Sequence, residues 1–269
     1  MVDLCKKVFE GYKNITVKGM SIYHQEANQD LLTRSPYMHK ISNLSCNMTD
    51  HAFYTIVHNS VEPQYKNYLQ LDPIDISNFN LPEKYAVVTT GFTSDSREWN
   101  AQSVNEVVDY LISKGVTPVF LGKSYTHAYK DVGINGSFKA DYEKVGSINL
   151  IDKTDLFEAH SIMDGALVTL GLDNGLLHLC GMSKGKSIWG FTTVLPEHRL
   201  PYKDGVQGKD CLVVIPNEKE LACIGCQSKM NFAPTTHNFT ECFYGENDYK
   251  CIDLMSSDKW IDQLQKMCI

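Results

Sequence analysis

The sequence predicts a doubly wound, Rossmann-like α/β fold, in which helices cover both faces of a parallel sheet. Short apolar, β-branched runs alternate with segments of helical periodicity from residue 84 to residue 215. The runs are apolar throughout rather than at every second position, which is typical of strands buried on both faces. Regular alternation of this kind predicts parallel strands joined by crossover helices.

Six apolar runs are expected to form the strands of this sheet. They cover residues 85–90, 117–122, 148–151, 166–170, 187–191 and 211–215. Between the first two runs, Ser103 and Glu106 have the spacing of a capping box, and valines follow at helical intervals. This pattern predicts a helix that begins at Ser103 and ends at Gly115, where glycine suits the end of a helix.

Two further helices and a second lobe complete the prediction. One helix is expected from about Thr154 to Met163, and another follows Asn174. Near the N-terminus, an amphipathic helix over residues 3–12 and a strand near residues 15–23 predict a reduced or incomplete α/β lobe over residues 1–80. Residues 84–269 then form the main domain, including a cysteine-containing C-terminal tail.

Composition and charge exclude several classes of protein. The 269 residues carry a net charge of −7, and no more than two Lys or Arg residues are adjacent. The sequence therefore lacks the clusters of basic residues that are typical of general nucleic-acid binding. No apolar run approaches the roughly 18 to 20 residues that a membrane span needs. The N-terminal residues lack the apolar core of a signal peptide, so a cytoplasmic location is expected.

Candidate ligand-binding residues follow three of the predicted strands at their carboxyl ends, where sheets of this kind bind ligands. These segments are Thr90–Trp99, Gly122–Ser124 and Asp173–Gly175. The dinucleotide pattern G-x-G-x-x-G and the Walker pattern are absent, which argues against nicotinamide dehydrogenases and P-loop enzymes. A helix beginning at Asn174 would still offer free N–H groups and a positive dipole end to a phosphate.

These segments resemble the hallmarks of one enzyme family. Asp173-Asn174-Gly175-Leu176-Leu177-His178-Leu179-Cys180 is similar to its Asp-[Thr/Ser]-Gly-x-x-His-Leu-Ala motif, and Gly190-Phe191-Thr192-Thr193 is similar to its Phe-Gly-x-Thr strand end. Gly91 to Trp99 and Asn149 to Leu156 match two further signatures in order and spacing. Over residues 84–215 the chain therefore resembles the ADP-heptose:lipopolysaccharide heptosyltransferases, glycosyltransferases of the GT-B architecture.

The resemblance implies an inverting transfer of a sugar from a nucleotide-diphosphate sugar to a glycan acceptor of lipopolysaccharide type. It implies no catalytic cofactor, and no Asp-x-Asp pair stands at a strand end to hold a divalent metal against a diphosphate. The residues expected to act in catalysis are His178, Arg97 and Asp173, of which Asp173 is also expected to organise the turn. The residues expected to bind the donor are Thr90, Gly91, Thr93, Ser94, Arg97, Lys123, Asn174, Gly175, His178, Thr192 and Thr193.

The chain departs from the family pattern in ways that leave the donor and the base open. Asn174 stands where Thr or Ser is usual, and Arg97 stands where Lys is usual. The residues after Gly122 lack the family's glutamate, so the donor sugar and nucleotide are undetermined. The family's opening strand is also missing, and the candidates for an acceptor base are His24, Glu26 and Asp30.

Alternative interpretations remain for the function and for single residues. The chain is also compatible with a phage-type glycosyltransferase acting on a modified nucleic-acid base, or with a non-catalytic sugar-nucleotide-binding module. A related epimerase is disfavoured because Leu176 and Leu177 stand where paired glutamates would be expected. His178 is alternatively a core histidine, and Trp99 is alternatively a core tryptophan.

Eight of the nine cysteines fall into two groups. Cys5, Cys46, Cys180 and Cys211 are isolated in apolar or mixed surroundings and are expected to pack as small hydrophobic residues. Cys223, Cys226, Cys242 and Cys251 are compatible in number with a structural zinc site. Two disulfides or four free thiols are the alternatives for this second group.

Overall fold

A computed structural model of the chain describes residues 71–89, 99–123, 141–181, 185–196, 200, 211–226, 242 and 249–269. Its centre is a six-stranded sheet in the order β3-β2-β1-β4-β5-β6, and all of its pairings are parallel. The strands are β1 (Tyr85–Thr89), β2 (Thr117–Leu121), β3 (Ile148–Asn149), β4 (Thr169–Leu172), β5 (Ser187–Gly190) and β6 (Cys211–Val214). The predicted doubly wound α/β fold is confirmed.

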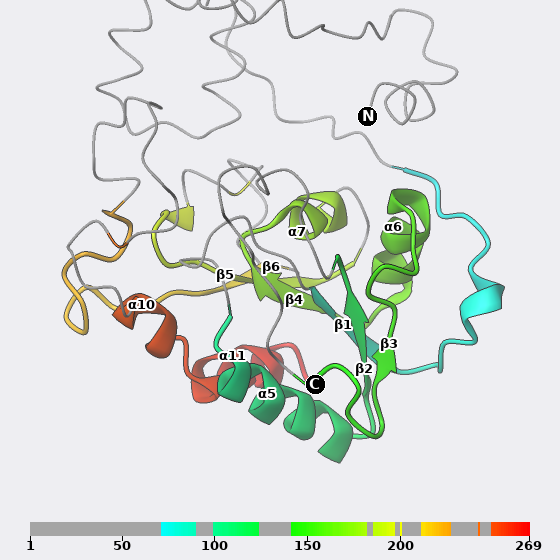
Figure 1. Ribbon diagram of the computed structural model, residues 1–269, viewed down its shortest axis with the longest axis horizontal. Coiled ribbons are helices and arrows are strands. Elements are labelled where there is room, and N and C mark those ends of the chain that lie inside the picture. Colours follow the sequence, from blue (N-terminus) through cyan, green and yellow to red (C-terminus); the bar gives the residue numbers. More distant parts are fainter. Residues whose placement is uncertain are drawn as a thin grey trace, which may run out of the picture.

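Helices cover both faces of the sheet, as Figure 1 shows. On one face lie α5 (Ala101–Ser113) and α11 (Ser257–Lys266), and on the other lie α6 (Leu156–Gly165) and α7 (Gly175–Cys180). The short helices η1 (Ser77–Phe79) and α10 (Lys250–Asp253) lie at the margins.

The sheet separates two apolar cores, and β1 contributes to both. Ala86 and Val88 pack into the core under α5 and α11, whereas Tyr85 and Val87 pack into the core under α6. Successive side chains of a strand point to opposite faces of the sheet, and both faces are covered here. All five residues of β1 are therefore buried. This explains why the strand is apolar throughout.

The predicted start of the first helix is wrong by three residues. The N-cap of α5 is Asn100, whose side chain accepts hydrogen bonds from the N–H groups of Gln102 and Ser103. Ser103 lies inside the helix, and its hydroxyl donates to the carbonyl of Met255 at 2.8 Å. A tertiary contact therefore uses the hydroxyl that local spacing had assigned to a cap.

The next helix and strand also begin later than predicted. Helix α6 begins at Leu156 because Asp155 caps it, and Asp155 forms a capping box with Glu158. The helix continues to Gly165, so the strand predicted over residues 166–170 lies at Thr169–Leu172 instead. The predicted strand over residues 148–151 ends at Asn149, whose side chain accepts the N–H of Ile151 and closes a turn.

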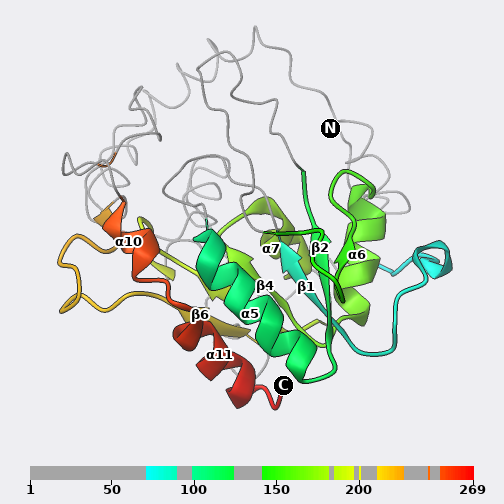
Figure 2. The same cartoon turned by 60° about the horizontal axis from the view of Figure 1, so that its bottom comes forward.

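The C-terminal helix docks alongside α5, and Figure 2 shows the two side by side. Trp260 of α11 is fully buried and stacks on Trp99, with the ring centroids 3.8 Å apart. Gly190 in β5 makes room for this helix, since a Cβ there would lie 2.8 Å from both Trp260 and Met255. The close approach of α11 to the sheet therefore depends on the missing side chain.

The predicted helix over residues 3–12 and strand near residues 15–23 lie outside the described residues. Residues 71–84 are described and lie against the main domain. The N–H of Ile74 donates to the hydroxyl of Ser161 in α6 at 2.8 Å, and Ile76, Phe79 and Leu81 pack against the adjacent core. Within the described ranges, no helix is long and apolar enough to cross a membrane.

Candidate functional site

The strand order reverses between β1 and β4, and the candidate site lies at the carboxyl ends of these two strands. From β1 the chain builds the sheet toward β2 and β3, and then returns through α6 to place β4 on the opposite side of β1. Ligands of open α/β sheets bind in the crevice at such a switch point. The residues at this edge are Thr89 at the end of β1 and the turn Asp173-Asn174 after β4.

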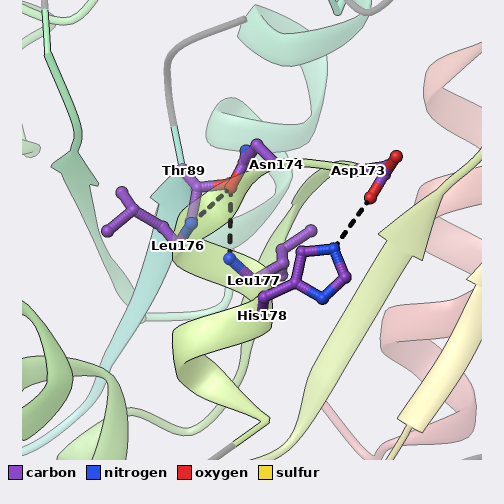
Figure 3. A network of polar contacts seen from close by, with 6 residues as sticks. All are labelled: Thr89, Asp173, Asn174, Leu176, Leu177 and His178. Carbon is purple, nitrogen blue, oxygen red and sulfur yellow. Dashed lines mark hydrogen bonds and ion pairs between the residues drawn. The ribbon is translucent and has the colours of Figure 1, made fainter. Parts of the chain in front are cut away.

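Asn174 links the two strand ends and caps the helix that follows (Figure 3). Its side-chain oxygen accepts the N–H groups of Leu176 and Leu177 at 3.0 and 3.1 Å. Its side-chain nitrogen donates to the hydroxyl of Thr89 at 2.9 Å. Two of the N–H groups that were expected to be free for a phosphate are therefore already satisfied by Asn174.

Asp173 and His178 form a polar pair beside this cap (Figure 3). Nε2 of His178 lies 3.2 Å from Oδ1 of Asp173, and the Asp173 side chain is only 5% exposed. Because a carboxylate only accepts hydrogen bonds, Nε2 carries a proton and donates to Asp173. The imidazole ring also packs edge-to-face against Trp189, with the ring centroids 5.0 Å apart.

His178 differs from a core histidine in its exposure. Its side chain is 33% exposed, whereas His160 in α6 is 1% exposed. Asp173 and Trp189 fix the ring while part of it remains open to solvent. His178 is therefore only partly buried in this structure, and its role at the site stays a prediction.

Thr192 and Thr193 follow β5 at the same edge of the sheet and are both buried. The carbonyl of Thr192 accepts the N–H of Gly225 at 2.8 Å, which ties this turn to the segment that carries Cys223 and Cys226. The hydroxyl of Thr193 has no hydrogen-bond partner within the described part of the chain.

Lys123 follows β2 and lies on the surface. Its Nζ is 3.9 Å from Oδ1 of Asp152, and both side chains are about half exposed. A pair of this kind contributes little to stability. Gly175, the first residue of α7, has open space where a Cβ would be.

The remaining predicted donor-binding residues lie outside the described residues: Thr90, Gly91, Thr93, Ser94 and Arg97. Trp99, just after them, is 4% exposed and belongs to the core under α5, so its alternative interpretation as a core residue is confirmed. Thr89, the last residue of β1, was not predicted as a site residue. Its hydroxyl lies where a Cβ of Gly171 in the neighbouring strand β4 would be, a relationship that only the folded structure shows.

Cys223, Cys226, Cys242 and Cys251 are all free thiols in this structure. Burial raises the pKa of Cys251 to about 12, and Cys226, Cys223 and Cys242 contribute further to the increase. The alternative of two disulfides is therefore wrong in this structure. In the described ranges, no three histidine, cysteine or acidic side chains are gathered closely enough to hold a metal ion. Cys180 and Cys211 are buried in the core, as predicted.

Comparison with known proteins assigns the family. The model of glycosyltransferase family 9 (heptosyltransferase) matches residues 47–227, which is more than half of the chain. The chain therefore belongs to glycosyltransferase family 9. No curated protein matches it.

Solved structures of glycosyltransferases share the fold. The dodecameric iron-containing glycosyltransferase TibC from enterotoxigenic E. coli H10407 is 19% identical, with a TM-score of 0.57 over 74% of this chain and 49% of TibC. A family 9 glycosyl transferase from Veillonella parvula is 13% identical, with a TM-score of 0.54 over 83% of this chain and 60% of that one. E. coli ADP-heptose lps heptosyltransferase II is 12% identical, with a TM-score of 0.50 over 77% of this chain and 55% of the heptosyltransferase. The chain thus spans about half the length of these structures.

Proposed function

We propose that the chain binds a nucleotide-diphosphate sugar at the β1–β4 edge and transfers its sugar to a hydroxyl acceptor. The observation that carries this proposal is the Asp173–His178 pair at the switch point of the sheet. Family membership supports the same reaction class. ADP-heptose is the donor to test first, because TibC has been solved in complex with ADP-D-beta-D-heptose.

The leaving nucleoside diphosphate is the group that the protein has to stabilise. As the bond between the anomeric carbon and the phosphate oxygen breaks, negative charge grows on the diphosphate. Nε2 of His178 is already engaged by Asp173, so a contact with a phosphate oxygen falls to Nδ1. Nδ1 donates to a phosphate oxygen only in the imidazolium form. Arg97 is the second cation that we assign to the diphosphate.

In an inverting transfer the acceptor hydroxyl attacks the anomeric carbon from the face opposite the diphosphate, and a base takes the hydroxyl proton. His24, Glu26 and Asp30 remain the candidates for this base. A glycan of lipopolysaccharide type is the acceptor that we propose. The reaction needs no divalent metal in this account, because the two cationic side chains neutralise the leaving group.

Calorimetric titration with ADP-heptose, together with an assay for released ADP, tests the proposal. We expect saturable binding, and turnover when a lipopolysaccharide-type acceptor is added. The same turnover is expected in the presence of a chelator. Donor binding without turnover of any acceptor would favour the non-catalytic binding module, and turnover of DNA bases alone would favour the phage-type enzyme.

A further inference from the structure

The hydrogen bond between Asn174 and Thr89 crosses the switch point of the sheet. Thr89 is the last residue of β1, and Asn174 is the N-cap of α7 after β4. The bond is 2.9 Å long, and Thr89 is only 3% exposed. This partly buried bond links the end of β1 to the start of α7, the helix that follows the neighbouring strand β4.

The hydroxyl of Thr89 makes two hydrogen bonds. It accepts from Nδ2 of Asn174 and also donates to the carbonyl of Leu170 in β4 at 3.3 Å. The amide of Asn174 is likewise engaged at both ends, because its oxygen accepts the N–H groups of Leu176 and Leu177. Neither side chain has to reorient to complete this network.

Gly171 provides the space for the Thr89 hydroxyl. A Cβ at Gly171 would lie 1.9 Å from Oγ1 of Thr89 and 3.3 Å from its carbonyl oxygen. No real Cβ comes that close to another atom, so any other residue at position 171 would displace the hydroxyl. Glycine weakens the interior of a strand, and a close approach of this kind is a reason to keep it there.

The network accounts for the departure of Asn174 from the family pattern. The usual Thr or Ser also caps a helix, but its shorter side chain has no amide group to reach a neighbouring strand. Asparagine caps α7 with its oxygen and reaches Thr89 with its nitrogen. The substitution adds a link between β1 and the turn that carries Asp173 and His178.

We infer that Thr89, Asn174 and Gly171 are positioning residues for the donor. They hold the carboxyl end of β1 against the turn that carries Asp173 and the helix α7 that carries His178. The inference rests on the proposed function, because the quantity that it predicts is affinity for a nucleoside diphosphate. Asn174 then acts through its neighbours and not by touching the donor.

Removing the Thr89 hydroxyl without changing its shape tests this inference. Thr89→Val removes the acceptor of Nδ2 of Asn174, and we expect the Kd for ADP to rise about 3- to 10-fold, as for one lost hydrogen bond. Thr89→Ser restores the hydroxyl and should recover most of the affinity. Thr169→Val is the matched control, because its buried hydroxyl in β4 has no partner within the described residues.

A double-mutant cycle separates this role from a general loss of stability. Asn174→Ser should weaken ADP binding, and adding Thr89→Val to it should cost less than Thr89→Val costs alone, because the shared bond is already gone. Affinities are measured by calorimetry well below the melting temperature of each variant. Strictly additive effects, or a Thr89→Val variant that binds ADP as the wild type does, would overturn the inference and leave the proposed function intact. A wild-type chain that binds no nucleoside diphosphate would overturn both.

Discussion

Trp99 and Trp260 stack with their ring centroids 3.8 Å apart, although one lies just before α5 and the other lies in the last helix. The contact joins the segment matched by the family model to residues beyond its end at position 227. Further contacts follow the length of α5: Asn100 donates to Asp253, Ser257 donates to Glu106, and Tyr110 donates to the carbonyl of Ile269. The C-terminal helices are therefore part of the fold of this domain.

Truncating Trp260 should strongly destabilise the domain. We expect Trp260→Ala to lower the free energy of unfolding by about 3 to 5 kcal/mol, because it empties a fully buried site beside Gly190 and Met255. Trp260→Phe keeps a ring over Trp99 and should cost less. Urea unfolding measures both, with the exposed Lys266→Ala as the control. A loss below about 1 kcal/mol for Trp260→Ala would show that the stack contributes little.

Tyr85 predicts a loss of stability at alkaline pH. Burial raises its pKa from 10.0 to about 12, with a further contribution from the charge of Asp164. The folded state favours the neutral phenol. The stabilisation that Tyr85 gives to the folded state is therefore complete below pH 10 and is lost as the pH rises toward 12. Tyr85→Phe removes the bond to the carbonyl of Ile162 and should be less stable at pH 9, by about 1 kcal/mol.

The comparison of the two proteins across pH checks this prediction. Urea unfolding of wild type and Tyr85→Phe at several pH values between about 9 and 12 gives the difference in unfolding free energy at each pH. We expect the difference to shrink as the pH rises through this interval. A constant difference would mean that Tyr85 titrates alike in the folded and unfolded chains.

Because Asp173 and His178 are hydrogen-bonded, we expect substitutions of the two residues to have non-additive effects on donor affinity. His178→Ala should weaken binding of ADP by about 1.5 to 3 kcal/mol, the range for a hydrogen bond to a charged group. Asp173→Asn should have a smaller effect in the His178→Ala background than alone, because Asp173 acts partly through the imidazole. Calorimetry on the four proteins tests this. Full additivity would show that Asp173 acts independently of His178.

The sheet was predictable because its signals are local. Continuous apolar runs such as Tyr85–Thr89 indicate strands buried on both faces, and the motif around Asp173 and His178 follows one of them directly. Contacts between distant segments were not predictable in this way. Ser103 and Asn100 are both good N-caps, and only the carbonyl of Met255, far along the chain, decides that Ser103 is not the cap.

The role of Thr89 was hidden for the same reason. A threonine at the end of a β-branched run has the composition expected of a strand, and Gly171 alone suggests only a weakened strand. The two residues have a function only once β1 and β4 are neighbours, and that pairing depends on the order of the whole sheet. Strand order is a non-local property that periodicity does not encode.

The most direct test of the central claim is a calorimetric titration of the full chain with ADP-heptose, comparing wild type with Arg97→Ala and with Lys266→Ala, an exposed cation on α11. The account predicts saturable binding to wild type and to Lys266→Ala. It predicts binding weaker by about 1.5 to 3 kcal/mol for Arg97→Ala, as expected when a charge-assisted bond to a diphosphate is lost. Two results would contradict this assignment of the donor site. One is a folded Arg97→Ala variant that binds ADP-heptose as tightly as the wild type does, and the other is a wild-type chain that binds no nucleotide-diphosphate sugar.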